Sequence, residues 1–247
     1  MSERRKVLIA VPSWGVAPPE AMDFRERVAF FCGQWQAQPD CPYEFSFACQ
    51  PDMLVQFARE EICLSAVMQG FEFVGMIDDD MIGPVDIWQK LLASDVDVVA
   101  PLAFTRRPPY RPVIYAVRGG WVPGSTQRAL HHHFVLNYPK DRLFECDSVG
   151  FGAVLIKTAV LRKLSNPWFF QMSGSNGTGE DIYFCRRAQE EVGARIFCDA
   201  RVKLGHLSLP RRYVGEEDFE RESPEVQTMR EEVGEWNKDK SKQNLAA

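Results

Sequence analysis

The sequence lacks four features that would each indicate a particular class of protein. No stretch approaches the roughly 20 consecutive apolar residues that a membrane span requires. The apolar run at 7–11, behind a basic amino terminus, is too short for a signal sequence. We therefore expect a cytoplasmic protein with no transmembrane segment. Peripheral contact with a membrane is still compatible with this sequence.

A basic excess and paired cysteines are also missing. The formal net charge of -5 at pH 7 disfavours a nucleic-acid-binding protein, which usually carries a basic face. Seven cysteines, an odd number at irregular spacing with no Cys-x-x-Cys, favour free thiols in a reducing compartment. What is present is a 247-residue chain that is 45% hydrophobic, enough for one large α/β domain with a short appendage.

Strand and helix signals alternate through the first 102 residues. Buried-strand patterns and helical spacings follow one another over 6–12, 20–35, 43–49, 53–69, 71–77, 86–93 and 96–102. We expect Asp52 to cap the second helix and Gly70 to end it. This alternation predicts an α/β fold with a mostly parallel central sheet flanked by helices, in which ligands bind at the carboxyl ends of the strands.

The rest of the chain changes character. We expect a proline-rich loop at 105–112, short strands over 113–137, a glycine-punctuated strand at 145–157 and a loop at 173–179 that is either a lid or a plain connector. A helix over 180–192 and two short strands at 195–198 and 201–204 follow. Residues 211–247 are highly charged and predict a solvated helical tail.

Three consecutive aspartates, Asp78, Asp79 and Asp80, follow the apolar strand at 71–77. Because side chains alternate along an extended backbone, we expect Asp78 and Asp80 on one side and Asp79 on the other. The repulsion between two neighbouring carboxylates is relieved by a divalent cation, and oxygen ligands suit Mg²⁺ or Mn²⁺. Such an ion can hold a diphosphate, although a solvated acidic turn is the simpler alternative.

Two later positions add to this signal. Glu180 and Asp181 open the helix at 180–192, where Asp181 either deprotonates an acceptor hydroxyl or merely caps the helix together with Glu180. His206 directly follows the last short strand and is either a metal ligand, which would shift the preference towards Mn²⁺, or an ordinary histidine.

An ordered set of segments resembles a known family: KVLIAVP (6–12), AREEICLSAV (58–67), FVGMIDDDM (73–81), VGFGAVLIK (149–157), GEDIYFCRRA (179–188) and VKLGH (202–206). Together they resemble glycosyltransferases of the GT-A fold, similar to the inverting family-two type, over roughly residues 5–210. The resemblance implies a single GT-A, Rossmann-like domain over 1–210, with a nucleotide-binding half to about 102 and an acceptor half over 103–210, before the tail at 211–247. It also implies transfer of a sugar from a nucleotide-diphosphate sugar, with UDP favoured, to an unknown acceptor.

The resemblance further implies roles for the matching positions. Asp78 and Asp80 would bind the metal and the sugar nucleotide, His206 would be the third protein ligand of the metal, and Asp181, or failing that Glu180, would be the catalytic base. The nucleotide would be contacted by Val11, Pro12, Ser13, Trp14, Arg59 and the Asp78–Asp80 run, including Asp79. Gly150 and Gly152 would let the acceptor approach the backbone.

Other functions are compatible with parts of this pattern. One is a non-catalytic protein of the same fold that binds sugar nucleotides or carbohydrate. Another is a nucleotidyltransferase, although residues 11–15 make a poor glycine-rich phosphate loop. Arg106, Arg107 and Arg111 either hold an anion or lie on a solvated loop. The histidines at 131–133 suit a wet strand better than a zinc site.

Overall fold

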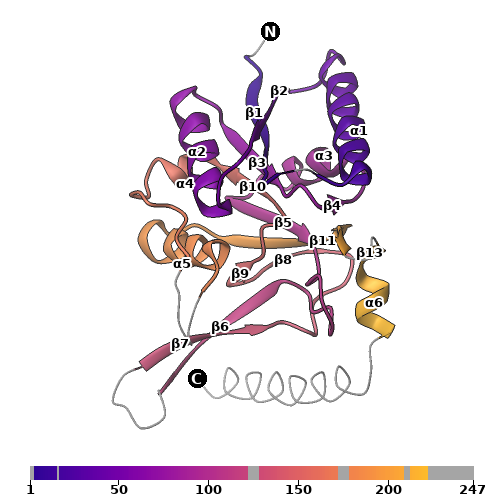
Figure 1. Cartoon of the computed structure of the whole chain (residues 1–247). Helices are drawn as coiled ribbons and strands as arrows, with labels where there is room; N and C mark the ends of the chain where they lie inside the picture. The colour runs from indigo at the N-terminus through magenta and orange to yellow at the C-terminus, as the bar shows by residue number, and fades with distance from the viewer. Residues whose placement is uncertain (1–2, 16, 122–127, 172–177, 209–211, 222–247) are drawn as a thin grey trace.

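The computed structural model describes residues 3–15, 17–121, 128–171, 178–208 and 212–221. A seven-stranded sheet forms its centre (Figure 1). In spatial order the strands are β2 (Tyr43–Gln50), β1 (Arg5–Pro12), β3 (Phe73–Ile77), β10 (Ala153–Lys157), β5 (Val98–Leu102), β11 (Ile196–Lys203) and β8 (Leu143–Glu145).

Most strands of this sheet run in one direction. β1 pairs in parallel with β2 and β3, and β11 pairs in parallel with β5. β10 runs antiparallel to both β3 and β5, and β8 runs antiparallel to β11. Thus β1, β2, β3, β5 and β11 share one direction and only β10 and β8 oppose it. The predicted α/β fold with a mostly parallel central sheet is confirmed.

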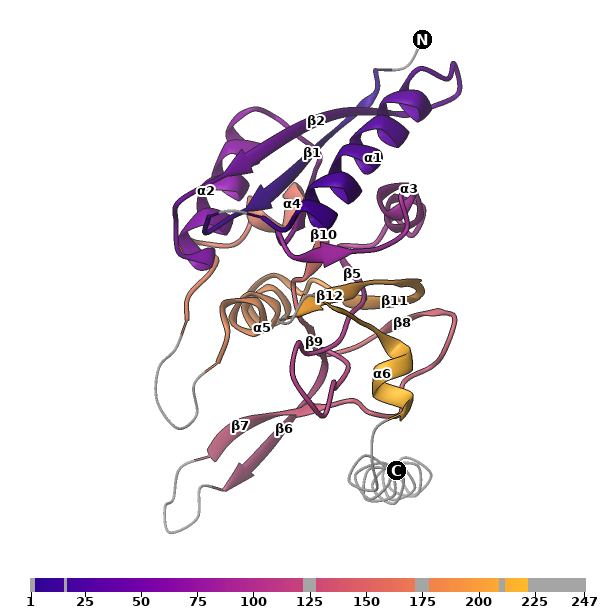
Figure 2. The ribbon, with the colours of Figure 1, turned by 45° about the vertical axis from the view of Figure 1, so that its right-hand side comes forward.

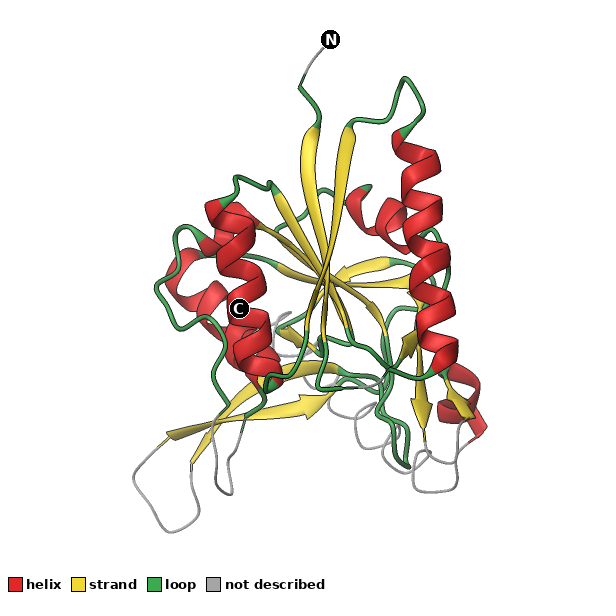
Figure 3. Ribbon diagram, turned by 45° about the horizontal axis from the view of Figure 1, so that its top comes forward, coloured by secondary structure: helices red, strands yellow, loops and turns green. Residues whose placement is uncertain are grey.

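Helices cover both faces of the sheet (Figures 1 and 3). α1 (Pro19–Gln36) and α3 (Ile87–Leu92) pack one apolar core, in which Phe24 and Trp88 are buried. α2 (Val55–Met68), α4 (Thr158–Leu161) and α5 (Glu180–Val192) pack a second core, in which Ile62 and Phe184 are buried. Two cores form because the fully buried central strands project apolar side chains from both faces.

Two small sheets extend this body. One joins β4 (Met81–Ile82), β12 (Gly205–Ser208) and β13 (Arg212–Val214), and the other joins β9 (Ser148–Val149), β6 (Ile114–Trp121) and β7 (Arg128–Phe134). The β6–β7 hairpin extends away from the central sheet (Figure 2). α6 (Glu216–Arg221) buries Phe219 against Phe104. None of the helices in the described part of the chain combines the length and apolarity that crossing a membrane requires.

Several local predictions need correction. Asp52 does not cap α2: the helix begins at Val55, the cap position is Leu54 without a side-chain hydrogen bond, and Asp52 has a φ of 57°. Gly70 does end the helix, with a φ of 75°. The strand predicted at 145–157 is split into β9 and β10 by a turn, whereas the two strands predicted over 195–204 form the single strand β11. Most of the loop at 173–179 and most of the tail lie outside the described residues.

Candidate active site

A cavity of about 340 Å³ opens where β1 and β3 end. It brings together ten residues that the sequence singled out from segments far apart in the chain: Pro12, Ser13, Trp14, Arg59, Asp78, Asp79, Asp80, Glu180, Asp181 and His206. Val11 does not join them, because it lines a separate apolar pocket beside α1. The sequence-based selection therefore corresponds to one place in the fold.

The three aspartates all line this cavity, contrary to the expected alternation. β3 ends at Ile77 and the chain then turns, so the strict two-residue period of a strand no longer applies. The backbone N–H of Asp78 donates to the carbonyl of Gly152 (2.9 Å), which anchors the start of the turn to the neighbouring strand. Asp79 accepts a 2.6 Å hydrogen bond from the hydroxyl of Ser13 and so joins the ends of β1 and β3.

Arg59 is the buried cation of the site, with 2% of its surface exposed. Its Nη2 donates to Asp78 Oδ1 (2.8 Å) and to the carbonyl of Phe151 (2.9 Å), and its Nη1 pairs with Glu180. Burial raises the pKa of Asp78 to about 7, and the nearby Arg59 charge opposes that rise. Arg59 therefore joins α2 to the end of β3 and to the start of α5.

Asp80 lies between an imidazole and a second guanidinium. β12 pairs with β4, which places His206 beside Met81, and the N–H of Leu207 donates to the carbonyl of Asp80 (2.9 Å). His206 Nδ1 lies 2.7 Å from the carbonyl oxygen of Phe104. Because a carbonyl only accepts hydrogen bonds, Nδ1 carries a proton, and the other ring nitrogen, Nε2, lies 3.7 Å from Asp80 Oδ1. The other oxygen, Asp80 Oδ2, pairs with Arg106.

Within the described ranges, no three or more His, Cys, Asp or Glu side chains are already gathered as a metal cluster. The donor atoms nevertheless fit a divalent cation. Asp80 Oδ1 is buried without a hydrogen-bond partner among the described residues, and bonds of about 2.1 Å to it and to His206 Nε2 can span their 3.7 Å separation. The Nδ1–H···O=C bond of His206 is the arrangement that orients a metal-binding histidine.

Glu180 and Asp181 are the first two residues of α5, but neither acts as its N-cap, which is Gly179 and makes no side-chain capping bond. Asp181 Oδ1 instead accepts a 2.7 Å hydrogen bond from the adjacent N–H of Ile182. Burial and the neighbouring Glu180 raise the pKa of Asp181 to about 6, while Arg59 opposes the rise. A carboxylate with that pKa is largely ionised at neutral pH and can accept a proton.

The two glycines between β9 and β10 line the cavity but have a packing role of their own. A Cβ on Gly150 would lie 2.8 Å from the Cβ of Val113, and one on Gly152 would lie 2.9 Å from the Sδ-methyl carbon of Met81. Close packing is therefore sufficient to require glycine at Gly150, whereas at Gly152 the close atom is the end of the flexible Met81 side chain, which can move aside.

Of the three arginines that the sequence offered together as anion ligands, Arg106 is the one that lines the cavity. It follows the end of β5, as Asp78 follows the end of β3, on a loop closed by Thr105 and Arg111. The N–H of Thr105 donates to the carbonyl of Arg111 (2.8 Å), and the N–H of Arg111 donates to the hydroxyl of Thr105 (2.9 Å). Arg106 is the first of the three arginines after β5, and nearness to the carboxyl end of a central strand was the available signal for choosing it.

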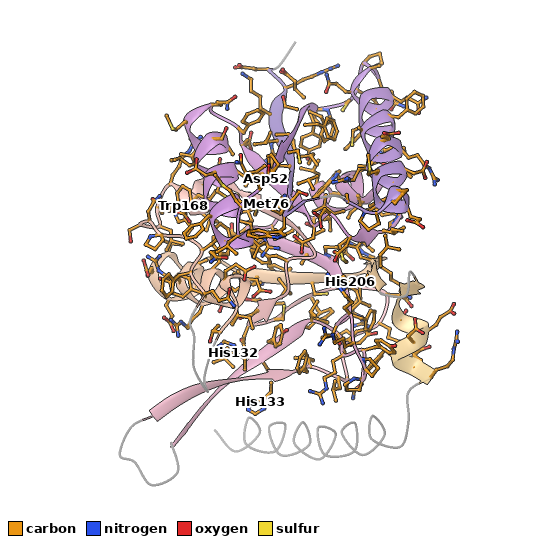
Figure 4. The ribbon with its side chains drawn as sticks, viewed as in Figure 1. Asp52, Met76, His132, His133, Trp168 and His206 are labelled. Carbon is orange, nitrogen blue, oxygen red and sulfur yellow. The ribbon has the colours of Figure 1, made fainter. Side chains whose placement is uncertain are left out.

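The histidine tract lies apart from this cavity. His132 and His133 are on β7 in the projecting hairpin, whereas His206 is on β12 (Figure 4). The side chain of His131 lies outside the described residues. The structure therefore does not bring His132 or His133 to the aspartates.

No family model and no curated protein matches the chain. Among solved structures, A197 from STIV is 18% identical, with a TM-score of 0.51 over 85% of this chain and 93% of that one. A UDP-glucose pyrophosphorylase complexed with UDP-glucose is 11% identical, with a TM-score of 0.43 over 86% and 92%. A glycosyltransferase involved in the glycosylation of the major capsid of PBCV-1 is 11% identical, with a TM-score of 0.28 over 65% and 68%. At these identities the likeness concerns the fold alone. By this comparison the chain shares the fold of A197 from STIV.

Proposed function

We propose that the protein is a glycosyltransferase that moves a sugar from a nucleotide-diphosphate sugar, with UDP favoured, to an acceptor of unknown class. One observation carries the proposal: the aspartates after β3 share a single cavity with His206 and Asp181. This arrangement provides acidic ligands for a cation and a separate carboxylate that can act as a base. In this proposal the cavity has a donor side, built mainly from residues before about 102 together with the metal ligand His206, and an acceptor side built mainly from residues 103–210.

The donor side would hold the nucleotide between the end of β1 and the aspartates. Trp14 is 68% exposed while lining the cavity, so its ring is free to stack on a base. Pro12 and Ser13 would lie beside the ribose. Asp78, Asp80 and His206 would hold Mn²⁺ or Mg²⁺, and this ion would supply the positive charge that stabilises the departing diphosphate.

Asp181 is the better candidate base because Glu180 is engaged by Arg59. In the proposed reaction the acceptor hydroxyl transfers its proton to the carboxylate of Asp181 as its oxygen forms a bond to the anomeric carbon. The bond between that carbon and the diphosphate oxygen breaks, and the electron pair leaves with the nucleoside diphosphate. Each bond formed is matched by one that is broken, and no other reactant is needed.

Donor binding is the direct test. Thermal unfolding is followed with UDP-, GDP- and CDP-sugars, each with and without Mn²⁺. A ligand at about a hundredfold excess over its dissociation constant should stabilise the protein by about 2.7 kcal/mol, and only with the metal present. Asp80→Asn should abolish this effect. Asp52→Asn is the matched control, because Asp52 is exposed and has a positive φ that asparagine tolerates.

The result that contradicts the proposal is tight nucleotide binding that needs no metal and is unaffected by changing Asp78 or Asp80. Product analysis then separates the alternatives. Release of the nucleoside diphosphate from the donor indicates glycosyl transfer, and release of pyrophosphate from a nucleoside triphosphate with a sugar phosphate indicates nucleotidyl transfer. Binding without turnover of either kind indicates a non-catalytic protein.

A further inference from the structure

Arg106 makes an ion pair with the same carboxylate that the proposed function assigns to the metal. Its side chain is 53% exposed, whereas that of Asp80 is 15% exposed. The guanidinium pairs with Asp80 Oδ2, and His206 Nε2 faces Asp80 Oδ1 at 3.7 Å. Asp80 is therefore already neutralised on one side when no ligand is bound.

A guanidinium and a divalent cation on one carboxylate repel each other, so the metal and Arg106 compete for Asp80. A phosphate group offers Arg106 an alternative partner, because the planar guanidinium matches the geometry of phosphate oxygens. The loop that carries Arg106 is held by the backbone bonds of Thr105 and Arg111, so the half-exposed side chain can turn from Asp80 to a ligand without moving the loop.

We infer that Arg106 is a phosphate-binding residue of the donor site that pairs with Asp80 until a diphosphate arrives. The inference rests on the proposed function and adds a basic residue to donor recognition. When the diphosphate binds, Arg106 transfers to a phosphate oxygen and leaves Asp80 to the metal. Metal and diphosphate binding are therefore coupled, since each removes an obstacle to the other.

The test measures two affinities in the full-length protein: that of Mn²⁺ alone, from the electron paramagnetic resonance signal of free Mn²⁺, and that of UDP at saturating Mn²⁺, by calorimetry. Arg106→Ala should bind Mn²⁺ alone about tenfold more tightly, because the competitor is gone, and UDP about tenfold more weakly, because a charged hydrogen bond is lost. Arg107→Ala is the matched control: it removes the same charge from the next, exposed position, which does not line the cavity, and should change neither affinity.

The two shifts must occur together and in opposite directions. If the wild type binds Mn²⁺ and UDP but Arg106→Ala shows any other pattern, the role of Arg106 is overturned while the proposed function stands. If the wild type binds neither ligand, both are overturned. Arg106→Lys keeps the charge without the planar fork, and it replaces Arg106→Ala if melting curves show that the alanine variant is unfolded; the same two directions are then required, at smaller size.

Discussion

Arg59 Nη2 lies 2.8 Å from Asp78 Oδ1, and this contact joins α2 to the aspartates at the end of β3. The guanidinium is 3% exposed and also pairs with Glu180, whose side chain is 12% exposed. Two carboxylates from distant parts of the chain thus depend on one buried positive charge. Arg59 is therefore a structural element of the site as well as a candidate nucleotide contact.

Replacing Arg59 by methionine should destabilise the protein by about 3–5 kcal/mol, because it leaves carboxylates without their compensating charge. Urea denaturation at pH 7.5 measures the free energy of unfolding. Arg27→Ala is the control. The Arg27 side chain is 65% exposed, and the substitution removes only a surface ion pair with Asp23, at 3.7 Å. Equal stability of the Arg59→Met variant and the wild type would show that the ion pairs of Arg59 with Asp78 and Glu180 contribute nothing to the free energy of unfolding.

Asp181 should make stability depend on pH in a defined direction. Its pKa is about 6 in the folded protein against an ordinary value of 3.8, so the folded state resists its ionisation more than the unfolded chain does. The contribution of Asp181 to stability is therefore highest below pH 3.8, falls as the pH rises to about 6, and is constant above that. Asp181→Asn should raise the free energy of unfolding by about 2 kcal/mol at pH 7.5 and change it little at pH 4.

The same variant tests the proposed role of Asp181, because it should lose transfer activity while becoming more stable at pH 7.5. Activity of the wild type should rise as the pH increases through about 6, where the base becomes ionised. Asp40→Asn is the control, since Asp40 is exposed at the end of a turn. A stabilised Asp181→Asn variant with full activity would remove Asp181 from the mechanism and leave the pKa argument intact.

Trp14 and Phe30 are equally exposed, at 68%, but only Trp14 lines the cavity. Trp14→Ala should weaken the binding of UDP by about tenfold, corresponding to the loss of about 1–1.5 kcal/mol of stacking, and should leave the melting temperature unchanged. Phe30→Ala should change neither quantity. Equal UDP affinities in the two variants would place the base elsewhere.

Two glycines should respond in opposite ways to the same substitution. A Cβ at Gly75 would lie 2.7 Å from Ile9 Cδ1 and 2.8 Å from Trp88 Cζ3, so Gly75→Ala should destabilise the protein by about 1–3 kcal/mol. Gly33 is inside α1 with nothing within 4 Å of its Cβ position, so Gly33→Ala should stabilise it by up to about 1 kcal/mol. Calorimetric melting distinguishes the two, and a destabilised Gly33→Ala variant would contradict the packing argument.

The sequence predicted the central sheet well because its strands are short apolar runs bounded by turns or by the aspartates. It could not predict the reversed direction of β10, since the buried apolar run at 153–156 reads the same in either direction. The capping role given to Asp52 was wrong because the backbone turns at Asp52, with positive φ, before α2 begins at Val55.

The cavity was easier to foresee than the contacts inside it. Acids that follow a central strand are expected at the ligand-binding edge, so Asp78 to Asp80 could be chosen from their position alone. The pairing of Arg59 with Glu180 joins residues 121 positions apart, and no local pattern encodes that contact. The alternation expected for Asp79 failed because the strand stops at Ile77, one residue before the run begins.

The strand order indicates which part of the chain can vary in length. β5 ends at Leu102 and its neighbour β10 begins at Ala153, so the intervening chain departs from the middle of the sheet and returns beside its point of departure. Near its two ends it holds the aspartates, through the ion pair of Arg106 with Asp80 and the hydrogen bond from the Asp78 N–H to the Gly152 carbonyl, and β8 pairs with β11, whereas the β6–β7 hairpin extends away from the sheet (Figure 2). Under the proposed function, this hairpin is therefore the part of the excursion that can be lengthened, shortened or exchanged without disturbing the aspartates, and so the place at which an acceptor preference would change.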